Sequence, residues 1–168
     1  MSVEIAIARN ADDLEGLAEI LREYLTWDIA QLCEISGVDL DVEDYAGKTF
    51  DEIGLYYAPQ GRLLLTREAG RLVGIGFLKP IGNHTCEIKR MYVRPEQRGK
   101  GLGKALLTRL IDDAKQIGYT KILLDSALYM KRAHALYCSM GFTDVEYYSE
   151  GETDEALKDF LVYMELRI

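Results

Sequence analysis

The residues best suited to chemistry form one short segment, Arg98-Gly99-Lys100-Gly101-Leu102-Gly103, which is followed by Lys104. A predicted strand precedes this segment and a predicted helix opens within it. Glycines allow the backbone to approach an anion closely and to adopt positive φ angles. The start of a helix adds unpaired N–H groups and roughly half a positive charge. Because Arg98, Lys100 and Lys104 add full charges, the segment predicts a site for phosphate groups.

Two familiar phosphate-binding patterns do not fit this segment. A P-loop requires GxxxxGK[ST], but Arg98 stands five positions before Gly103, and Ala105 follows Lys104. The dinucleotide pattern GxGxxG would place its third glycine at Lys104 or Leu106. What remains is the pattern R-x-x-G-x-G, which does not indicate a nucleotide-binding protein of either class.

The elements around the loop predict a single α/β domain over residues 1–168. Short turns join three alternating segments, which indicates an antiparallel meander before the loop. The expected strands are Val3–Ala8, Arg62–Arg67, Leu72–Ile81, Thr85–Val93, Lys121–Asp125, a strand near Val145–Ser149 and Phe160–Leu166. The expected helices are one that Asn10 or Asp12 caps, a short one within Asp39–Tyr57, Gly101–Ile117 and Met130–Met140. This order predicts a mixed sheet with helices on both faces.

Composition excludes several classes of protein. The net charge of −8 argues against nucleic-acid binding, whereas the basic run from Lys89 to Arg109 suits a small polyanion. Three scattered cysteines and two histidines predict no metal site. No apolar run approaches the roughly 18 residues that span a bilayer, and no secretory leader is recognisable. We therefore expect a cytoplasmic protein with no membrane partner.

Two motifs together resemble a known family. The segment Met91–Pro95 with the glycine loop resembles the pyrophosphate-binding motif of the GNAT superfamily of N-acetyltransferases. Ala135–Phe142 resembles the second motif of that superfamily. The resemblance implies an enzyme that uses acetyl-CoA as co-substrate and transfers the acetyl group to a primary amine. It also implies a mixed, mostly antiparallel sheet in which the two central strands splay apart.

The resemblance further implies roles for particular residues. The backbone amides of residues 98–104 would hold the diphosphate of coenzyme A, and backbone groups near Met91 and Val93 would pair with pantetheine. Tyr137 would be the acid that protonates the departing thiolate, since a phenol is a neutral donor at pH 7. Many relatives carry asparagine where Met130 stands, so one contact to pantetheine is in doubt.

The base and the acceptor stay open. Asp125 at a strand end and Glu87 on the strand before the loop are both candidate bases, and ordered water is a third route for the amine proton. Acidic and aromatic residues in the first helices, in Asp39–Tyr57 and at residues 147–148 could suit a cationic amine, a polyamine, an amino acid or a protein amine. A non-catalytic acyl-CoA-binding module is the alternative function, and a homodimer is possible.

Overall fold

The computed structural model describes residues 3–148 and 153–168, which form one mixed sheet and its covering helices. The seven described strands run in the order β1-β2-β3-β4-β5-β7-β6. Their bounds are β1 Val3–Ile7, β2 Arg62–Glu68, β3 Arg71–Gly82, β4 Thr85–Val93, β5 Lys121–Ala127, β6 Thr143–Val145 and β7 Leu161–Arg167. Every neighbouring pair is antiparallel except β4 and β5. The predicted α/β class and mostly antiparallel sheet are confirmed.

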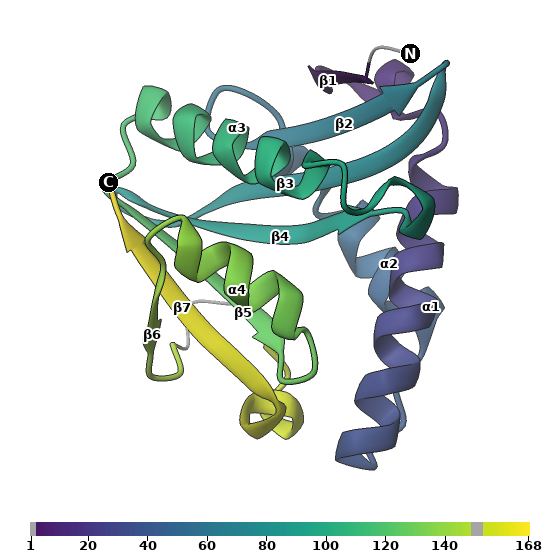
Figure 1. Cartoon of the computed structure of the whole chain (residues 1–168), viewed down its shortest axis with the longest axis vertical. Coiled ribbons are helices and arrows are strands. Elements are labelled where there is room, and N and C mark those ends of the chain that lie inside the picture. Colours follow the sequence, from purple (N-terminus) through teal and green to yellow (C-terminus); the bar gives the residue numbers. More distant parts are fainter. Residues whose placement is uncertain (1–2, 149–152) are drawn as a thin grey trace.

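Helices cover both faces of this sheet, as the sequence predicts (Figure 1). The helices are α1 Leu17–Ser36, α2 Val42–Asp51, α3 Leu102–Ile117 and α4 Lys131–Ser139, with short 3₁₀ turns η1 Ala11–Leu14, η2 Ile53–Tyr56, η3 Pro95–Gln97 and η4 Glu155–Phe160. Successive side chains of a strand point to opposite faces, so β2 contributes side chains to the hydrophobic cores on both faces of the sheet. Leu63 and Leu65 pack with α1 and α2, whereas Leu64 packs with α3.

The centre of the sheet contains a break in strand pairing. Residues Thr85–Glu87 of β4 pair in parallel with Lys121–Leu123 of β5. Beyond these three register pairs the two strands separate. Near the point of separation β4 also carries a bulge against β3. The bulge is at Arg90, which has a φ of 51°, a left-handed conformation that is uncommon for a residue with a Cβ. The splay implied by the family resemblance is therefore present.

Two boundaries differ from the sequence prediction. Asn10 does cap a turn, with its side chain accepting a 3.0 Å hydrogen bond from the Asp12 amide, but this turn is η1. Gly16 then adopts a left-handed conformation, with a φ of 82°, that separates this turn from the next helix. α1 therefore begins only at Leu17. The strand expected near Val145–Ser149 is also misplaced: β6 ends at Val145, residues 146–148 form no strand, and Ser149 lies outside the described residues.

Gly61 is required for the packing of η2 beside β2. A Cβ on Gly61 would lie 2.1 Å from the Leu55 carbonyl oxygen and 2.7 Å from backbone atoms of Tyr56. We expect Gly61→Ala to lower the free energy of unfolding by about 2 kcal/mol or more, because rigid backbone must move. Urea denaturation measures this loss. The control is Gly47→Ala in α2, where a Cβ meets nothing within 4 Å and helix propensity favours alanine; equal effects would contradict the assignment.

Candidate active site

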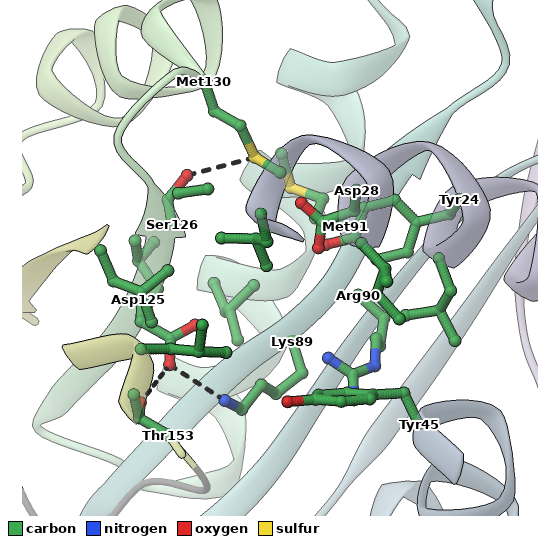
Figure 2. Close-up of a pocket in the computed structure, with 18 of the residues that line it drawn as sticks. Tyr24, Asp28, Tyr45, Lys89, Arg90, Met91, Asp125, Ser126, Met130 and Thr153 are labelled. Atoms are coloured by element: carbon green, nitrogen blue, oxygen red, sulfur yellow. Dashed lines mark hydrogen bonds and ion pairs between the residues drawn. The ribbon is translucent and has the colours of Figure 1, made fainter. Parts of the chain in front are cut away.

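A cavity of about 400 Å³ lies where β4 and β5 separate. Its walls come from both strands and from α1, α2, α4 and η4, so it connects the two faces of the sheet (Figure 2). Ile88, Leu124 and Tyr137 reach it from the face that α3 and α4 cover. Lys89 and Asp125 reach it from the opposite face. A molecule in this cavity can therefore be approached from two sides.

Tyr137 contributes a neutral phenol to the cavity. α4 positions it, and its ring packs 5.8 Å from that of Phe142. Only 6% of its surface is exposed, and burial together with the charge of Asp125 raises its pKa well above the ordinary value. The described residues provide no hydrogen-bond partner for its hydroxyl group, which leaves the phenol free to donate a proton or a hydrogen bond.

Lys89 joins the two carboxylates that sequence analysis proposes as bases. Its Nζ lies 3.2 Å from Glu87 Oε1 and 3.2 Å from Asp125 Oδ2, and all three side chains are largely or fully buried. Burial acts to raise the Asp125 pKa, but the charge of Lys89 and hydrogen bonds from Thr153 and Lys89 outweigh it, so this pKa is lowered. Asp125 is therefore ionised near neutral pH and is a weak proton acceptor.

Glu87 has the opposite character. Burial raises its pKa above the ordinary value, partly offset by the charge of Lys89. Tyr148 donates a 3.0 Å hydrogen bond to Oε1, while Oε2 has no partner in the described structure. Glu87 lies behind Lys89 and is not among the residues that line the cavity. Of the two predicted bases, only Asp125 is in contact with the cavity.

The glycine loop presents a row of unpaired backbone donors. Gly99 and Gly101 have φ angles of 77° and 83°, and Gly101 caps α3 without any side-chain hydrogen bond. Within the described chain, the N–H groups of residues 99–104 have no protein acceptor. Buried or ligand-facing amides require partners, and such a row at a helix start suits an anion. The amides of residues 99–104 are thus available for the predicted phosphate site, whereas the Arg98 amide, which the prediction included, donates to the Pro95 carbonyl at 3.2 Å.

The cationic side chains of the loop differ in availability. Arg98 turns back, so that its Nε donates a 2.9 Å hydrogen bond to the Val93 carbonyl and its guanidinium stacks over Trp27 and Tyr92. Lys100 Nζ donates to the Gln97 side chain at 2.7 Å. Lys104, exposed on the first turn of α3, has no ion pair among the described residues. It is the loop cation most available to a ligand.

Backbone groups of Met91 and Val93 face the separated side of β4. The Arg94 amide donates to the Val73 carbonyl of β3 at 2.9 Å. Along a strand, the backbone groups of successive residues point alternately toward the neighbouring strand on one side and on the other. Met91 and Val93 therefore face β5, which no longer pairs with β4 at this level. Their predicted availability to an extended ligand is consistent with this geometry.

Several lining residues were missed by sequence reasoning. Arg90 enters the cavity because of the bulge, although the sequence marked it only as part of the basic run, and Thr153 enters through a loop contact that has no sequence signal. Asp28 was not missed, because it is among the acidic residues of the first helices expected on the acceptor side; it lines the cavity and accepts a hydrogen bond from the Tyr129 hydroxyl. Met130, predicted as a departure from the family, does line the cavity, where the Ser126 hydroxyl donates to its sulfur at 3.4 Å. The Met130 sulfur therefore cannot donate a hydrogen bond to a molecule in the cavity.

The acidic residues of the stretch Asp39–Tyr57 lie mostly away from the cavity. Asp41 caps α2, and Glu43 pairs with Arg22 on the exposed surface at 2.8 Å. From this stretch the cavity receives Tyr45, Lys48 and Glu52 instead. This stretch therefore supplies the cavity with one aromatic residue, one carboxylate and one cation.

Comparisons with known proteins agree with this geometry. Residues 16–142 match the model of the acetyltransferase (GNAT) family, and the chain belongs to this family. It is an acyltransferase enzyme. An uncharacterized N-acetyltransferase of Schizosaccharomyces pombe is 31% identical over 88% of this chain and 86% of its own length. An IAA acetyltransferase of Azospirillum brasilense is 38% identical over 51% of this chain and 57% of that protein.

Solved structures show the same fold. The PaiA N-acetyltransferase of Thermoplasma acidophilum, in complex with coenzyme A, superposes with a TM-score of 0.75 at 24% identity over the full length of both chains. An acetyltransferase of Salmonella typhimurium with its cofactor acetyl-CoA gives 0.68 at 21% identity over 99% of this chain and 94% of its own. No helix in the described part of the chain is long and apolar enough to cross a membrane.

The Lys89 ammonium should be a large contributor to stability. We expect Lys89→Met to lower the free energy of unfolding by about 3–5 kcal/mol at pH 7, because it leaves the carboxylates of Glu87 and Asp125 without their cation. Removing the cation raises both folded-state pKa values. Protonation then relieves the repulsion, so the deficit should shrink as pH falls toward 5.

Urea denaturation of both proteins between pH 5 and pH 7 measures this difference. Arg22→Met is the control, because its pair with Glu43 is exposed and should contribute no more than about 1 kcal/mol. A Lys89→Met deficit that stays constant or grows toward pH 5 would show that the buried charges do not control stability.

Proposed function

We propose that this enzyme transfers the acetyl group of acetyl-CoA to a primary amine by direct attack of the amine on the thioester. One observation carries the proposal: unpaired amides at residues 99–104 lie at the start of α3, next to strand β4, whose far side opens onto the cavity containing Tyr137. A diphosphate, an extended amide-bearing arm and a reactive group require these three features in this order.

The residues present fit the cofactor. The amides of residues 99–104 and the Lys104 ammonium would hold the diphosphate, and an open hollow of about 450 Å³ beside Gly101 and Arg109 gives room for the nucleotide end. The backbone of Met91 and Val93 would pair with the pantetheine amides as an additional strand. The CoA-containing relative supports this placement by its similar fold.

Acetyl-CoA supplies an activated acyl carbon with a thiolate leaving group. The C–N bond forms as the C–S bond breaks, and the thiolate takes a proton. Tyr137 is suited to give that proton because its phenol is neutral and has no competing partner among the described residues. Backbone N–H groups of β4 that face the gap can stabilise the negative charge that develops on the carbonyl oxygen.

The amine proton leaves on the other face of the sheet. Asp125 is the carboxylate in contact with the cavity, and its lowered pKa makes it better suited to attract an ammonium than to keep a proton. We therefore propose that Asp125 orients the amine and that water carries the proton away. Glu87, whose raised pKa gives it the greater proton affinity, supports this centre through Lys89 and is the alternative acceptor.

Binding of the cofactor is the first test. Coenzyme A at about 100 times its dissociation constant should stabilise the folded state by about 2.7 kcal/mol and raise the melting temperature accordingly. ATP and NAD at the same concentration should have little effect. Differential scanning fluorimetry measures these shifts, and absence of any shift with coenzyme A or acetyl-CoA would exclude the proposal.

Two exposed lysines on α3 give a matched comparison for the same experiment. Lys104→Gln should weaken coenzyme A binding about tenfold, because a charge-assisted contact to phosphate is lost at the start of the helix. Lys115→Gln, in the last turn of α3, should leave the affinity unchanged. Equal losses would point to a general charge effect and not to a site at the loop.

Tyr137→Phe should lower kcat about 100-fold or more, since a positioned acid contributes on the order of 10²–10⁴ to a rate. The affinity for acetyl-CoA should change little, because the phenyl ring still packs on Phe142. Thiol release with a panel of amines measures turnover, and calorimetry measures binding. A large loss of affinity would identify Tyr137 as a structural residue, and full activity would remove it from the chemistry.

A further inference from the structure

Charges around the cavity are unevenly satisfied on the side that α1 and α2 cover. The lining includes the cations Lys48, Lys89 and Arg90 and the carboxylates Asp28, Glu52, Asp125 and Asp154. Carboxylates outnumber cations, yet each carboxylate already has a partner within the protein. Two of the three cations, Lys48 and Arg90, have no carboxylate partner among the described residues. Among the four carboxylates, Glu52 and Asp125 are paired with lysines, whereas Asp28 and Asp154 accept hydrogen bonds from neutral donors. Lys48 and Arg90 are the cations of this part of the cavity that remain available to a negatively charged group.

Each carboxylate is engaged by a nearby donor. Asp28 accepts from the Tyr129 hydroxyl, and Glu52 pairs with Lys79 at 3.0 Å. Asp125 accepts from Lys89 and Thr153, and Asp154 accepts from the Ala156 amide at 3.0 Å as the cap of η4. These hydrogen bonds and ion pairs reduce the capacity of the carboxylates to bind a further cation. The exception is the Glu87–Lys89–Asp125 centre.

Arg90 is the main unpaired cation. Its Nε donates a 3.2 Å hydrogen bond to the Thr49 hydroxyl, and no carboxylate of the described chain lies within salt-bridge distance. The charge of Arg90 acts on the Asp28 carboxylate only at longer range, without a direct ion pair. The left-handed bulge directs this side chain into the cavity beside Tyr45, across from Asp125 and Thr153 (Figure 2). A guanidinium placed in this way can bind a carboxylate through two parallel hydrogen bonds.

Lys48 extends the same positive region to the cavity mouth. It is exposed, and its Nζ lies 5.2 Å from the centre of the Tyr45 ring without an ion pair among the described residues. Lys48 and Arg90 thus flank Tyr45 from α2 and β4. Two cations from different elements around one aromatic residue form a subsite for a negatively charged group.

A second, oppositely charged subsite lies across the cavity. At the Glu87–Lys89–Asp125 centre one ammonium serves two carboxylates, which leaves an excess of negative charge when both are ionised. This centre attracts an ammonium, whereas Arg90 attracts a carboxylate. Arg90 also lowers the Asp125 pKa by its charge, so the two subsites are close enough to interact electrostatically.

We propose that the acceptor is a free amino acid, whose carboxylate binds Arg90 and Lys48 while its amine is held toward Asp125; this rests on the proposed acetyl transfer to an amine. The lining of the acceptor side also contains five aliphatic residues, Leu25, Ile29, Leu32, Leu157 and Leu161. An apolar side chain therefore fits better than a second charge. Leucine is the lead probe for this reason.

The test compares leucine with leucinamide and 3-methylbutylamine, within a panel of the standard amino acids and their amides. Thiol release from acetyl-CoA gives kcat and KM for each. We expect kcat/KM for the preferred amino acid to exceed that of its amide about 10- to 100-fold, the value of a hydrogen-bonded charged contact. The amide has the more readily deprotonated amine, so amine reactivity alone would favour the opposite order.

Variants assign the preference to the positive subsite. Arg90→Gln should raise KM for the amino acid about 10- to 100-fold and leave 3-methylbutylamine nearly unchanged, while Arg90→Lys should recover only part of the loss. Lys48→Gln, at an exposed position, should give a smaller loss in the same direction. Arg22→Gln, whose exposed pair with Glu43 lies outside the cavity, should behave as wild type. Melting temperatures verify that each variant is folded.

The outcomes separate this inference from the proposed function. Thiol release with simple amines but no preference for any amino acid over its amide would overturn the inference and leave acetyl transfer intact. An Arg90→Gln effect that is equal for leucine and 3-methylbutylamine would also overturn it. Calorimetric binding of the amino acid that depends on Arg90, without thiol release, would support the subsite and refute the acetyl transfer.

Discussion

The separation of β4 from β5 is the constraint on which the rest of the structure depends. Strand pairing normally satisfies backbone groups on both edges of a central strand, and here it stops after Glu87 and Leu123. The released edge of β4 leaves the backbone of Met91 and Val93 without a strand partner, and the Val93 carbonyl accepts a hydrogen bond from the Arg98 side chain instead. The gap itself provides the cavity, and it allows side chains from both faces of the sheet to meet at one place.

The same separation explains why a buried charged centre is retained. Burying an ammonium and two carboxylates is unfavourable compared with an apolar filling of the same volume. Lys89 lies at the edge of the gap, directly before the bulge at Arg90, and thus holds Asp125 of the separated strand at 3.2 Å. The ion pair links the two strands beyond the point where their backbone pairing ends. Its position therefore fixes a charge beside the cavity.

Local signals in the sequence predicted part of this arrangement. The loop of residues 98–104 was recognisable because glycines, cations and a helix start act within a few residues of one another. The antiparallel meander followed from alternation and short turns. The bulge that turns Arg90 into the cavity carried no signal, since a bulge with a positive φ usually contains glycine. The strand expected at residues 145–149 was misplaced because Tyr147 and Tyr148 form an aromatic cluster with Tyr163 and not a pairing segment.

The through-sheet cavity also separates the two proton transfers of the proposed reaction. Tyr137 packs in the core beneath α3 and α4, whereas Lys89 and Asp125 lie on the face of the sheet that α1 and α2 cover. On opposite faces, the amine can lose its proton on one side while the thiolate gains one on the other. In the described structure, the gap between β4 and β5 opens to Tyr137 on one face and to Asp125 on the other, so one bound molecule can contact both.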